Sequence, residues 1–235
     1  AVTEIFALPG NGGISADATC VPIGATDLDG IVQFVKEHPV DYAVVTPDDP
    51  LVLGCVDRLN EIGVPCFGPK QNAAVIEGSK AFAKDLMKKY HIPTARYETF
   101  SDLQAALDYV QAQPLPLVVK ADGLAAGKGV IVAEELDQAL DAVDSCFDGD
   151  FGDAGQTVVV EEMLTGPECS LLAFVSGGKA FCMAPAQDHK RAYDGDLGPN
   201  TGGMGAISPS PHYTPEIARR CMEEIFLPTV AALNA

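Results

Sequence analysis

PLVVKADGLAAGKGVIVA, residues 116–133, is the stretch on which the interpretation of the whole chain depends. Two β-branched runs flank a loop rich in glycine and lysine, whose members are Lys120, Gly123, Gly127, Lys128 and Gly129. Glycine lets backbone N–H groups turn toward an anion without a Cβ in the way, and the lysines add positive charge beside them. The pattern predicts a strand–loop–strand phosphate clamp; the alternative is a solvent-exposed glycine hairpin.

This loop departs from the P-loop of nucleotide triphosphatases at three points. The P-loop begins with glycine, ends in Gly-Lys followed by Ser or Thr, and opens a helix. Here Asp122 stands where the first glycine belongs, Gly129 replaces the hydroxyl residue, and a second strand follows. A strand–loop–strand hairpin that folds over phosphates is instead the arrangement of the ATP-grasp lid.

A second polar segment lies further along the chain. Residues 187–191 read QDHKR and residues 198–205 read GPNTGGMG, a density of charged and small residues without apolar periodicity. Such a segment does not form core. Together with the loop it resembles the glycinamide ribonucleotide synthetase family, the phosphoribosylamine–glycine ligases, which are ATP-grasp ligases of purine biosynthesis.

The resemblance covers essentially the whole chain. Four further strings carry it, at residues 9–11 (PGN), 67–69 (FGP), 77–82 (EGSKAF) and 161–164 (EEML). It implies a fold of mixed α/β and α+β class, in which a doubly wound parallel-sheet domain precedes the ATP-grasp fold. The expected parts are a doubly wound domain at 1–78, a connecting helix at 79–98, a lid domain at 99–163 and part of the ATP-grasp core at 164–235.

Local patterns agree with this order. Thr26 or Asp27 is expected to cap a helix, and a second helix is expected with Asp49 as its N-cap, Pro50 at its first position and Gly63 just past its end. These helices alternate with short apolar runs, as in a doubly wound sheet, whose ligands bind at the carboxyl ends of the strands.

Three further patterns predict elements of the second half. A capping box at residues 101–104 starts a β-α-β-β-α-β arrangement, and Gly177-Gly178 is expected at the turn of a hairpin. A helix is expected from Lys80 to about Tyr90, with Phe82 and Met87 on its apolar face. A last helix is expected to start at Pro215 and to stop before Pro228.

Composition excludes several classes of protein. The 235 residues carry a net charge of −18, which argues against nucleic-acid binding because that is driven by many Lys and Arg. No apolar run approaches the ~20 residues of a membrane helix, and no secretory signal is visible. Seven cysteines without a CxxC pair indicate a reducing cytoplasm with neither a disulfide framework nor a zinc site.

The resemblance implies roles for individual residues. The implied ATP-binding residues are Lys80, Lys120, Gly123, Gly127, Lys128, Gly129, Glu161, Leu164 and Glu168, where the turn at Glu161–Leu164 meets adenine and Glu168 meets the ribose. The implied substrate-binding residues are Gly10, Asn11, Asp188, Lys190, Arg191, Asn200, Thr201, Gly202, Gly203 and Met204. The implied catalytic residues are Lys120, Lys128, Asp188 and Arg191.

The implied reaction joins glycine to 5-phosphoribosylamine with ATP and Mg²⁺, Mn²⁺ being the other candidate ion. The chain starts without Met, ends at Ala235 in what resembles mid-domain, and lacks the family's strand of metal ligands. We therefore expect a fragment cut at both ends, with no metal ligand in this chain and no turnover by it alone. Alternatives are another ATP-grasp carboxylate–amine ligase and a non-catalytic nucleotide-binding fragment. Either a monomer or a homodimer fits the sequence.

Overall fold

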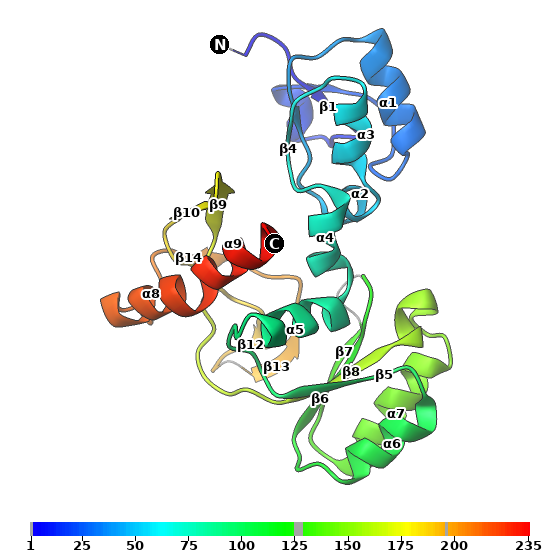
Figure 1. The fold of residues 1–235 in the computed structure, drawn as a ribbon, viewed down its shortest axis with the longest axis vertical. Helices are drawn as coiled ribbons and strands as arrows, with labels where there is room; N and C mark the ends of the chain where they lie inside the picture. Colours follow the sequence, from blue (N-terminus) through cyan, green and yellow to red (C-terminus); the bar gives the residue numbers. More distant parts are fainter. Residues whose placement is uncertain (1, 125–128, 196) are drawn as a thin grey trace. The chain divides into compact units, whose positions relative to one another are not determined.

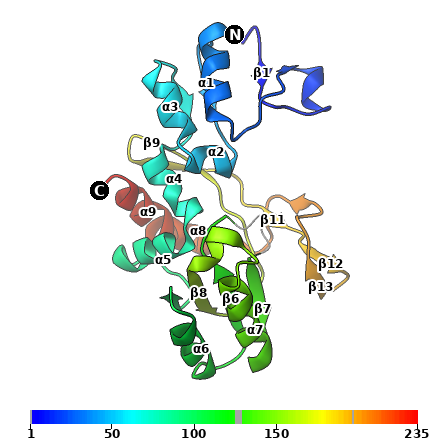
Figure 2. The same cartoon turned by 90° about the vertical axis from the view of Figure 1, so that its right-hand side faces the viewer.

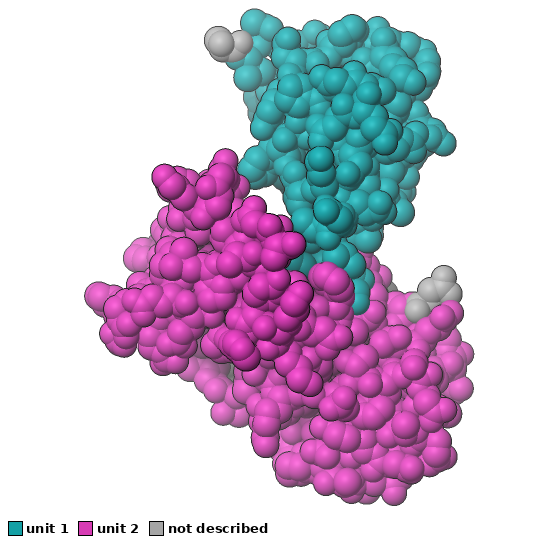
Figure 3. Space-filling model, viewed as in Figure 1, with its two compact units in different colours: residues 1–80 teal, residues 81–235 magenta. Residues whose placement is uncertain are grey.

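The computed structural model describes residues 2–124, 129–195 and 197–235, which form two compact units (Figure 3). Unit 1 runs to Lys80, and unit 2 runs from Ala81 to Ala235. In the described ranges, every helix is too short or too polar to cross a lipid bilayer.

Unit 1 alternates short strands with helices. Its elements are β1 (Phe6–Ala7), η1 (Ile14–Ala16), β2 (Thr19–Cys20), α1 (Leu28–Glu37), β3 (Ala43–Val44), α2 (Asp48–Val52), α3 (Cys55–Glu61), β4 (Cys66–Phe67) and α4 (Gln71–Gly78). β1 pairs with β2 and β3 pairs with β4, both in parallel, as the doubly wound pattern predicts. Among the described residues, no hydrogen-bonded ladder joins the β1–β2 pair to the β3–β4 pair. Residues in or next to these strands nevertheless pack into one apolar core with α1 and α3.

One side-chain cap and two glycines set the helix ends in this unit. The carboxylate of Asp27 accepts a hydrogen bond from the Gly30 N–H and caps α1 as predicted. The single helix predicted between Asp49 and Gly63 is wrong, because Gly54 has a φ of +88° and separates α2 from α3. Asp49 is not the N-cap either, since α2 already begins at Asp48. A left-handed residue interrupts α-helical hydrogen bonding, and glycine adopts it without a Cβ clash. Gly63, with a φ of +86°, follows the end of α3 as expected.

Unit 2 begins with a helix and a four-stranded sheet. The elements are α5 (Lys80–Lys89, of which Lys80 belongs to unit 1), β5 (Tyr97–Phe100), α6 (Leu103–Gln111), β6 (Leu117–Ala121), β7 (Val130–Ala133), α7 (Leu136–Phe147), η2 (Gly152–Gln156) and β8 (Val158–Glu162). This is the predicted β-α-β-β-α-β arrangement. The strand order is β5-β8-β6-β7, and every neighbouring pair is antiparallel.

The two faces of this sheet differ in character. Val119 of β6 and Val160 of β8 point into a core formed with α6 and α7, which lie side by side on that face (Figure 1). Because strand side chains alternate, Lys120 and Glu161 point to the opposite face. The apolar face therefore holds the sheet, and the opposite face carries its charged groups.

The rest of unit 2 is built from hairpins and one interrupted helix. The elements are β9 (Ala173–Ser176), β10 (Lys179–Cys182), β11 (Gln187–Asp188), β12 (Arg191–Tyr193), β13 (Leu197–Asn200), β14 (Ala206–Ile207), α8 (Pro215–Cys221), η3 (Met222–Phe226) and α9 (Leu227–Leu233). β9 and β10 form the predicted hairpin around Gly177-Gly178. β12 pairs with β13 (Figure 2), and β11 pairs with β14.

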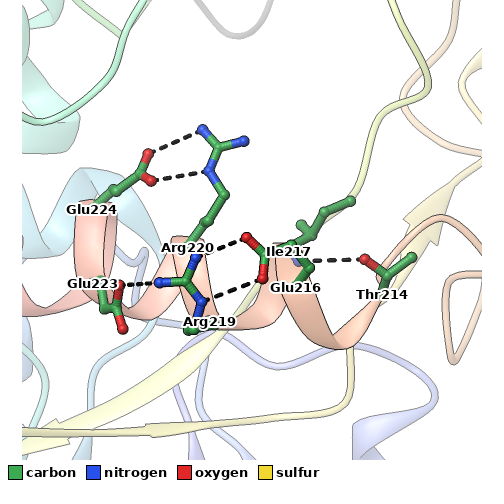
Figure 4. Close-up of polar contacts among 7 residues, drawn as sticks. All are labelled: Thr214, Glu216, Ile217, Arg219, Arg220, Glu223 and Glu224. Atoms are coloured by element: carbon green, nitrogen blue, oxygen red, sulfur yellow. Dashed lines mark hydrogen bonds and ion pairs between the residues drawn. The ribbon is translucent and has the colours of Figure 1, made fainter.

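The last helical segment runs past its predicted end and is divided into α8, η3 and α9. Thr214 Oγ1 accepts from the Ile217 N–H and caps α8, while ion pairs one turn apart join Arg219 to Glu216 and Glu223, and Arg220 to Glu224 (Figure 4). The predicted stop before Pro228 is wrong. A π-helical turn, η3, precedes α9, so the chain enters a new helix whose first turn holds Pro228. The missing N–H of proline costs nothing in a first turn.

The buried face of the sheet generates a stability prediction. We expect Val119→Ala to lower the free energy of unfolding of unit 2 by roughly 1–3 kcal/mol, because it leaves a cavity at a fully buried position. Val132→Ala is the matched control, since it removes the same atoms from the same sheet at a side chain that is 46% exposed. Urea denaturation measures both variants, and equal losses would contradict the assigned faces.

Candidate functional site

The charged face of the sheet is centred on one buried carboxylate. Glu161 Oε2 lies 3.0 Å from Lys84 Nζ, and its Oε1 lies 3.0 Å from Lys120 Nζ. The side chains of Glu161 and Lys84 are 6% and 9% exposed, whereas that of Lys120 is 25% exposed. Three charged groups from α5, β6 and β8 therefore meet at one point, and only Lys120 reaches toward solvent.

Lys84 is held in place by more than its ion pair. Its ammonium donates a hydrogen bond of 2.7 Å to Thr94 Oγ1 and lies 5.4 Å from the centre of the Tyr97 ring. The Tyr97 hydroxyl donates in turn to Asp85. Burying a charge is costly unless it is paired and hydrogen-bonded, and Lys84 satisfies both conditions.

The contact between Lys120 and Glu161 is of a different kind. Although the two atoms are 3.0 Å apart, Glu161 Oε1 has no partner with hydrogen-bond geometry among the described residues. We regard the contact as an ion pair that is not aligned as a hydrogen bond. Since an ammonium carries three N–H donors, Lys120 retains donors for an acceptor on the open face of the sheet.

Apolar side chains lie beside this cation. Val130 pairs with Lys120 across the ladder and Val132 pairs with Val118, so all four share a face. Val130 and Val132 are 45% and 46% exposed, and Leu164, just beyond β8, is also exposed. An exposed apolar surface next to a lysine suits a ligand with a flat apolar part and an anionic part.

The ends of the glycine-rich loop are anchored next to Lys120. The Ala121 N–H donates to the Gly129 carbonyl, while the Asp122 N–H donates to the carbonyls of Ala154 and Thr157. The Asp122 carboxylate also accepts from the Ala81 N–H at 2.6 Å, in the first turn of α5. The predicted residues Gly127 and Lys128 lie outside the described residues.

A Cβ on Gly123 would press against Ala154, so close packing already explains why a glycine occupies this position. That does not test the predicted phosphate contact at Gly123, which stays a prediction together with the one at Gly129. Lys80 is the first residue of α5, as predicted.

The second polar segment folds back on itself. Thr201 donates through both its N–H and its hydroxyl to the Lys190 carbonyl, and His189 exchanges backbone hydrogen bonds with Met204 and Gly205. This pairing brings residues 188–191 next to 200–205. Gly203, with a φ of +102°, lies where a Cβ would crowd the carboxylate of Asp188.

The two cations of this segment, Lys190 and Arg191, both lie close to groups that carry negative charge or accept hydrogen bonds. Lys190 Nζ lies 3.8 Å from Asp188 and 3.9 Å from Glu168, so the residue implied to bind ribose comes near the implied substrate residues. Arg191 Nη1 donates to the Gly198 carbonyl at 2.6 Å, which gives this guanidinium a structural partner in the β12–β13 hairpin. The remaining implied members, Asn200 and Gly202, lie in the same folded segment.

Two sequence-based expectations need correction. Glu161 is not part of a turn: it is a ladder residue of β8 between Tyr97 and Val118, and the open backbone begins at Met163. The buried face of α5 carries Ala83 and Lys84, whereas Phe82 is 42% exposed. The reason is that Glu161 requires a counter-charge, which Lys84 supplies.

Gly10 and Asn11 have local partners in the structure. The Asn11 side-chain oxygen accepts from the N–H groups of Gly13 and Ile14, which begins η1. Gly10 has a φ of +73°, and a Cβ there would collide with Cys20. Both residues thus have structural reasons to be present, and their implied contact with substrate stays a prediction.

Sequence reasoning missed Lys84, Thr94 and Tyr97. A signal existed, because Glu161 is a carboxylate at the end of an otherwise all-valine run that begins at Val158. The neighbouring Glu162 accepts from the Arg96 backbone N–H, which, together with the Arg96 guanidinium, holds the pKa of Glu162 below its usual value. This contact fastens the end of β8 to the chain that leads into β5.

Known proteins resemble the chain over its whole length. The family model for the phosphoribosylglycinamide synthetase N domain matches residues 1–77, and the model for the ATP-grasp (A) domain of the same synthetase matches residues 78–235. Phosphoribosylamine–glycine ligase from Agrobacterium fabrum is 50% identical over 232 residues, which cover 99% of this chain and 55% of that protein. The ligase from Allochromatium vinosum is 52% identical over 237 residues, which cover 100% and 55%. The chain thus spans about half the length of these curated relatives.

Solved structures agree on the fold. The crystal structure of phosphoribosylamine–glycine ligase from Thermotoga maritima matches with a TM-score of 0.82 and 33% identity, covering 97% of this chain and 55% of that one. Biotin carboxylase from Campylobacter jejuni matches with a TM-score of 0.77 at 14% identity, covering 94% and 51%, which shows the fold alone. The predicted fold class, an ATP-grasp fold after a doubly wound domain, is confirmed.

The environment of Tyr97 generates a pH prediction. Burial, and then the hydrogen bond to Asp85, raises the pKa of Tyr97 to about 12. The fold thus favours the neutral phenol, so this stabilisation is complete below the ordinary tyrosine pKa of 10.0 and is lost as the pH rises through about 12. NMR titration of ring-labelled tyrosines measures the midpoint. Asp85→Ala should lower it and the distant Asp137→Ala should not; an unchanged midpoint in Asp85→Ala would refute the assigned cause.

Proposed function

Because the chain belongs to the phosphoribosylglycinamide synthetase family, we propose that it is the ATP-binding part of a phosphoribosylamine–glycine ligase. The observation that carries the proposal is the cluster of Glu161, Lys84 and Lys120 beside the glycine-rich loop. It offers a preorganised positive charge next to exposed apolar side chains, which matches a nucleotide with its phosphates.

The reaction of such a ligase consumes ATP, glycine and 5-phosphoribosylamine and yields glycinamide ribonucleotide, ADP and phosphate. The carboxylate of glycine attacks the γ-phosphate to give glycyl phosphate and ADP. The amine of phosphoribosylamine then attacks the acyl carbon, loses a proton and releases phosphate. Negative charge gathers among the phosphates and the carboxylate, so fixed cations stabilise the transition state.

We assign the nucleotide to the open face of the sheet. Lys120 would contact its phosphates together with Lys80, Lys128 and the backbone of Gly123, Gly127 and Gly129. Past the end of β8, Leu164 would meet the adenine, and Glu168 would accept from the ribose hydroxyls because a carboxylate can accept from two hydroxyls at once. The support is the exposed apolar surface of Val130 and Val132 and the ladder that ends before Met163.

We assign glycine and phosphoribosylamine to the folded polar segment. Lys190 and Arg191 carry the positive charge that a carboxylate or phosphate requires, and Asp188 could hold an amine. Asn200, Thr201, Gly202, Gly203 and Met204 would form the floor beside them. Within unit 1, Gly10 and Asn11 are assigned to substrate binding separately. The support is that backbone pairing brings residues 188–191 and 200–205 together.

A divalent ion, Mg²⁺ or Mn²⁺, would neutralise phosphate charge when bound. Among the described residues no group of three or more His, Cys, Asp and Glu side chains is arranged to hold a metal. These residues therefore do not fit the ion by themselves, and our assignment routes no step through it. For the parent enzyme we propose a cytoplasmic location and action as a monomer or homodimer on small-molecule substrates.

The decisive experiment is Mg²⁺-dependent ADP release by the 235-residue chain. Glycine and freshly generated phosphoribosylamine are added singly and together. Release that requires both establishes the ligase reaction. ATP binding without release restricts the chain to nucleotide binding, and absence of ATP binding refutes the assignment altogether.

A single substitution tests the nucleotide site. Lys120→Ala should weaken ATP binding by roughly 10- to 100-fold, since a charge-assisted contact to phosphate contributes about 1.5–3 kcal/mol. Isothermal titration calorimetry measures the dissociation constant. The control is Lys179→Ala, which removes an exposed lysine from the β9–β10 hairpin of the same unit. Equal affinities for both variants would remove Lys120 from the site.

A further inference from the structure

Lys84 lies one helical turn beyond Lys80 and points away from solvent, so it does not itself reach a ligand on the open face. Its contacts nevertheless bear on the charge of the site. We propose that Lys84 is a positioning residue for ATP: by neutralising Glu161, it leaves the positive charge of Lys120 available to the phosphates. This inference rests on the proposed nucleotide site.

The argument starts from the arrangement of the three groups. Each carboxylate oxygen of Glu161 has one ammonium at 3.0 Å, Lys84 on Oε2 and Lys120 on Oε1. The charges sum to one net positive charge. It resides at Lys120, because this is the most exposed of the three side chains.

Without Lys84 the cluster would lose its net positive charge. Glu161 and Lys120 alone would form a neutral pair, and a phosphate that approached the ammonium would also come close to an uncompensated carboxylate 3.0 Å behind it. In a site of low dielectric constant that repulsion offsets much of the attraction. Lys84 removes this repulsion by neutralising Glu161 from the buried side, and there the lysine occupies no space that the ligand needs.

A purely structural account explains only part of this geometry. One lysine is enough to compensate one buried carboxylate, and Lys84 does so with support from Thr94 and Tyr97. The second lysine, on Oε1, is not aligned as a hydrogen bond and is more exposed than Lys84, so compensation of Glu161 does not by itself account for its position. Neighbouring carboxylates are engaged elsewhere, Asp85 with Tyr97 and Glu162 with Arg96.

The test compares Lys84→Met with the double variant Lys84→Met/Glu161→Gln. Lys84→Met should weaken ATP binding by roughly 10- to 100-fold, as expected for loss of one net positive charge beside phosphate. The double variant should bind ATP within about threefold of the wild type, because it removes both members of the buried pair and leaves Lys120 unopposed. Lys89→Met, which removes an exposed lysine from the last turn of α5, is the matched control and should bind normally.

Displacement of a fluorescent ATP analogue by ATP and by adenosine gives the readout that a structural role would not move. In Lys84→Met, ATP should lose affinity while adenosine, which has no phosphate, should not. If Lys84→Met does not fold, as circular dichroism and thermal unfolding would show, Lys84→Gln, which removes the charge but can still donate to Thr94, takes its place in the same comparison.

Normal ATP binding by a folded Lys84→Met protein, equal losses for ATP and adenosine, or more than tenfold weaker ATP binding by the double variant would each overturn the inference. Failure of the wild type to bind ATP would instead overturn the proposed function, and this inference with it.

Discussion

A carboxylate that cannot leave the protein interior is the constraint on which unit 2 depends. Glu161 is fixed by the register of β8 between β5 and β6, so its side chain must point to the face opposite the valine core. At that place it is shielded from water and must be compensated by charge. Helix α5 supplies Lys84 as a counter-charge, and β6 supplies Lys120. The requirement of one buried group thereby links a helix and two strands that are far apart in sequence.

Because of the same constraint, one face of the sheet stabilises the fold and the opposite face is left for ligand binding. Every second residue of β6 and β8 packs against α6 and α7, and the residues between them face the charge cluster. Apolar packing on one face can hold the strands rigid while the other face keeps exposed valines and a lysine. A site built on strands in this way is held more precisely than one built on loops.

Much of this arrangement was predictable from the sequence, because it rests on short-range signals. The glycine-rich loop between β-branched runs, the helix caps at Asp27 and Thr214 and the hairpin at Gly177-Gly178 are all local patterns. The misses were long-range. Lys84 is a lysine on a helix, and by helical periodicity alone it belongs to the solvent face; only the ladder that buries Glu161 explains its burial. Likewise Gly54 breaks a helix that the apolar pattern continues, and the π-helical turn at 222–226 admits Pro228.

The hydrogen bond from the Ala81 N–H to Asp122 bears on how phosphate-binding loops can evolve. Asp122 stands where a P-loop would have its first glycine, and its carboxylate serves a free N–H in the first turn of α5, a group that helices leave unsatisfied. Replacement of Asp122 by glycine would make the loop more like a P-loop, and it would also remove the acceptor for this N–H in the first turn of α5. The residue that distinguishes this loop from a P-loop therefore also ties the loop to the start of α5, so a change at this one position would act on the helix as well as on the loop.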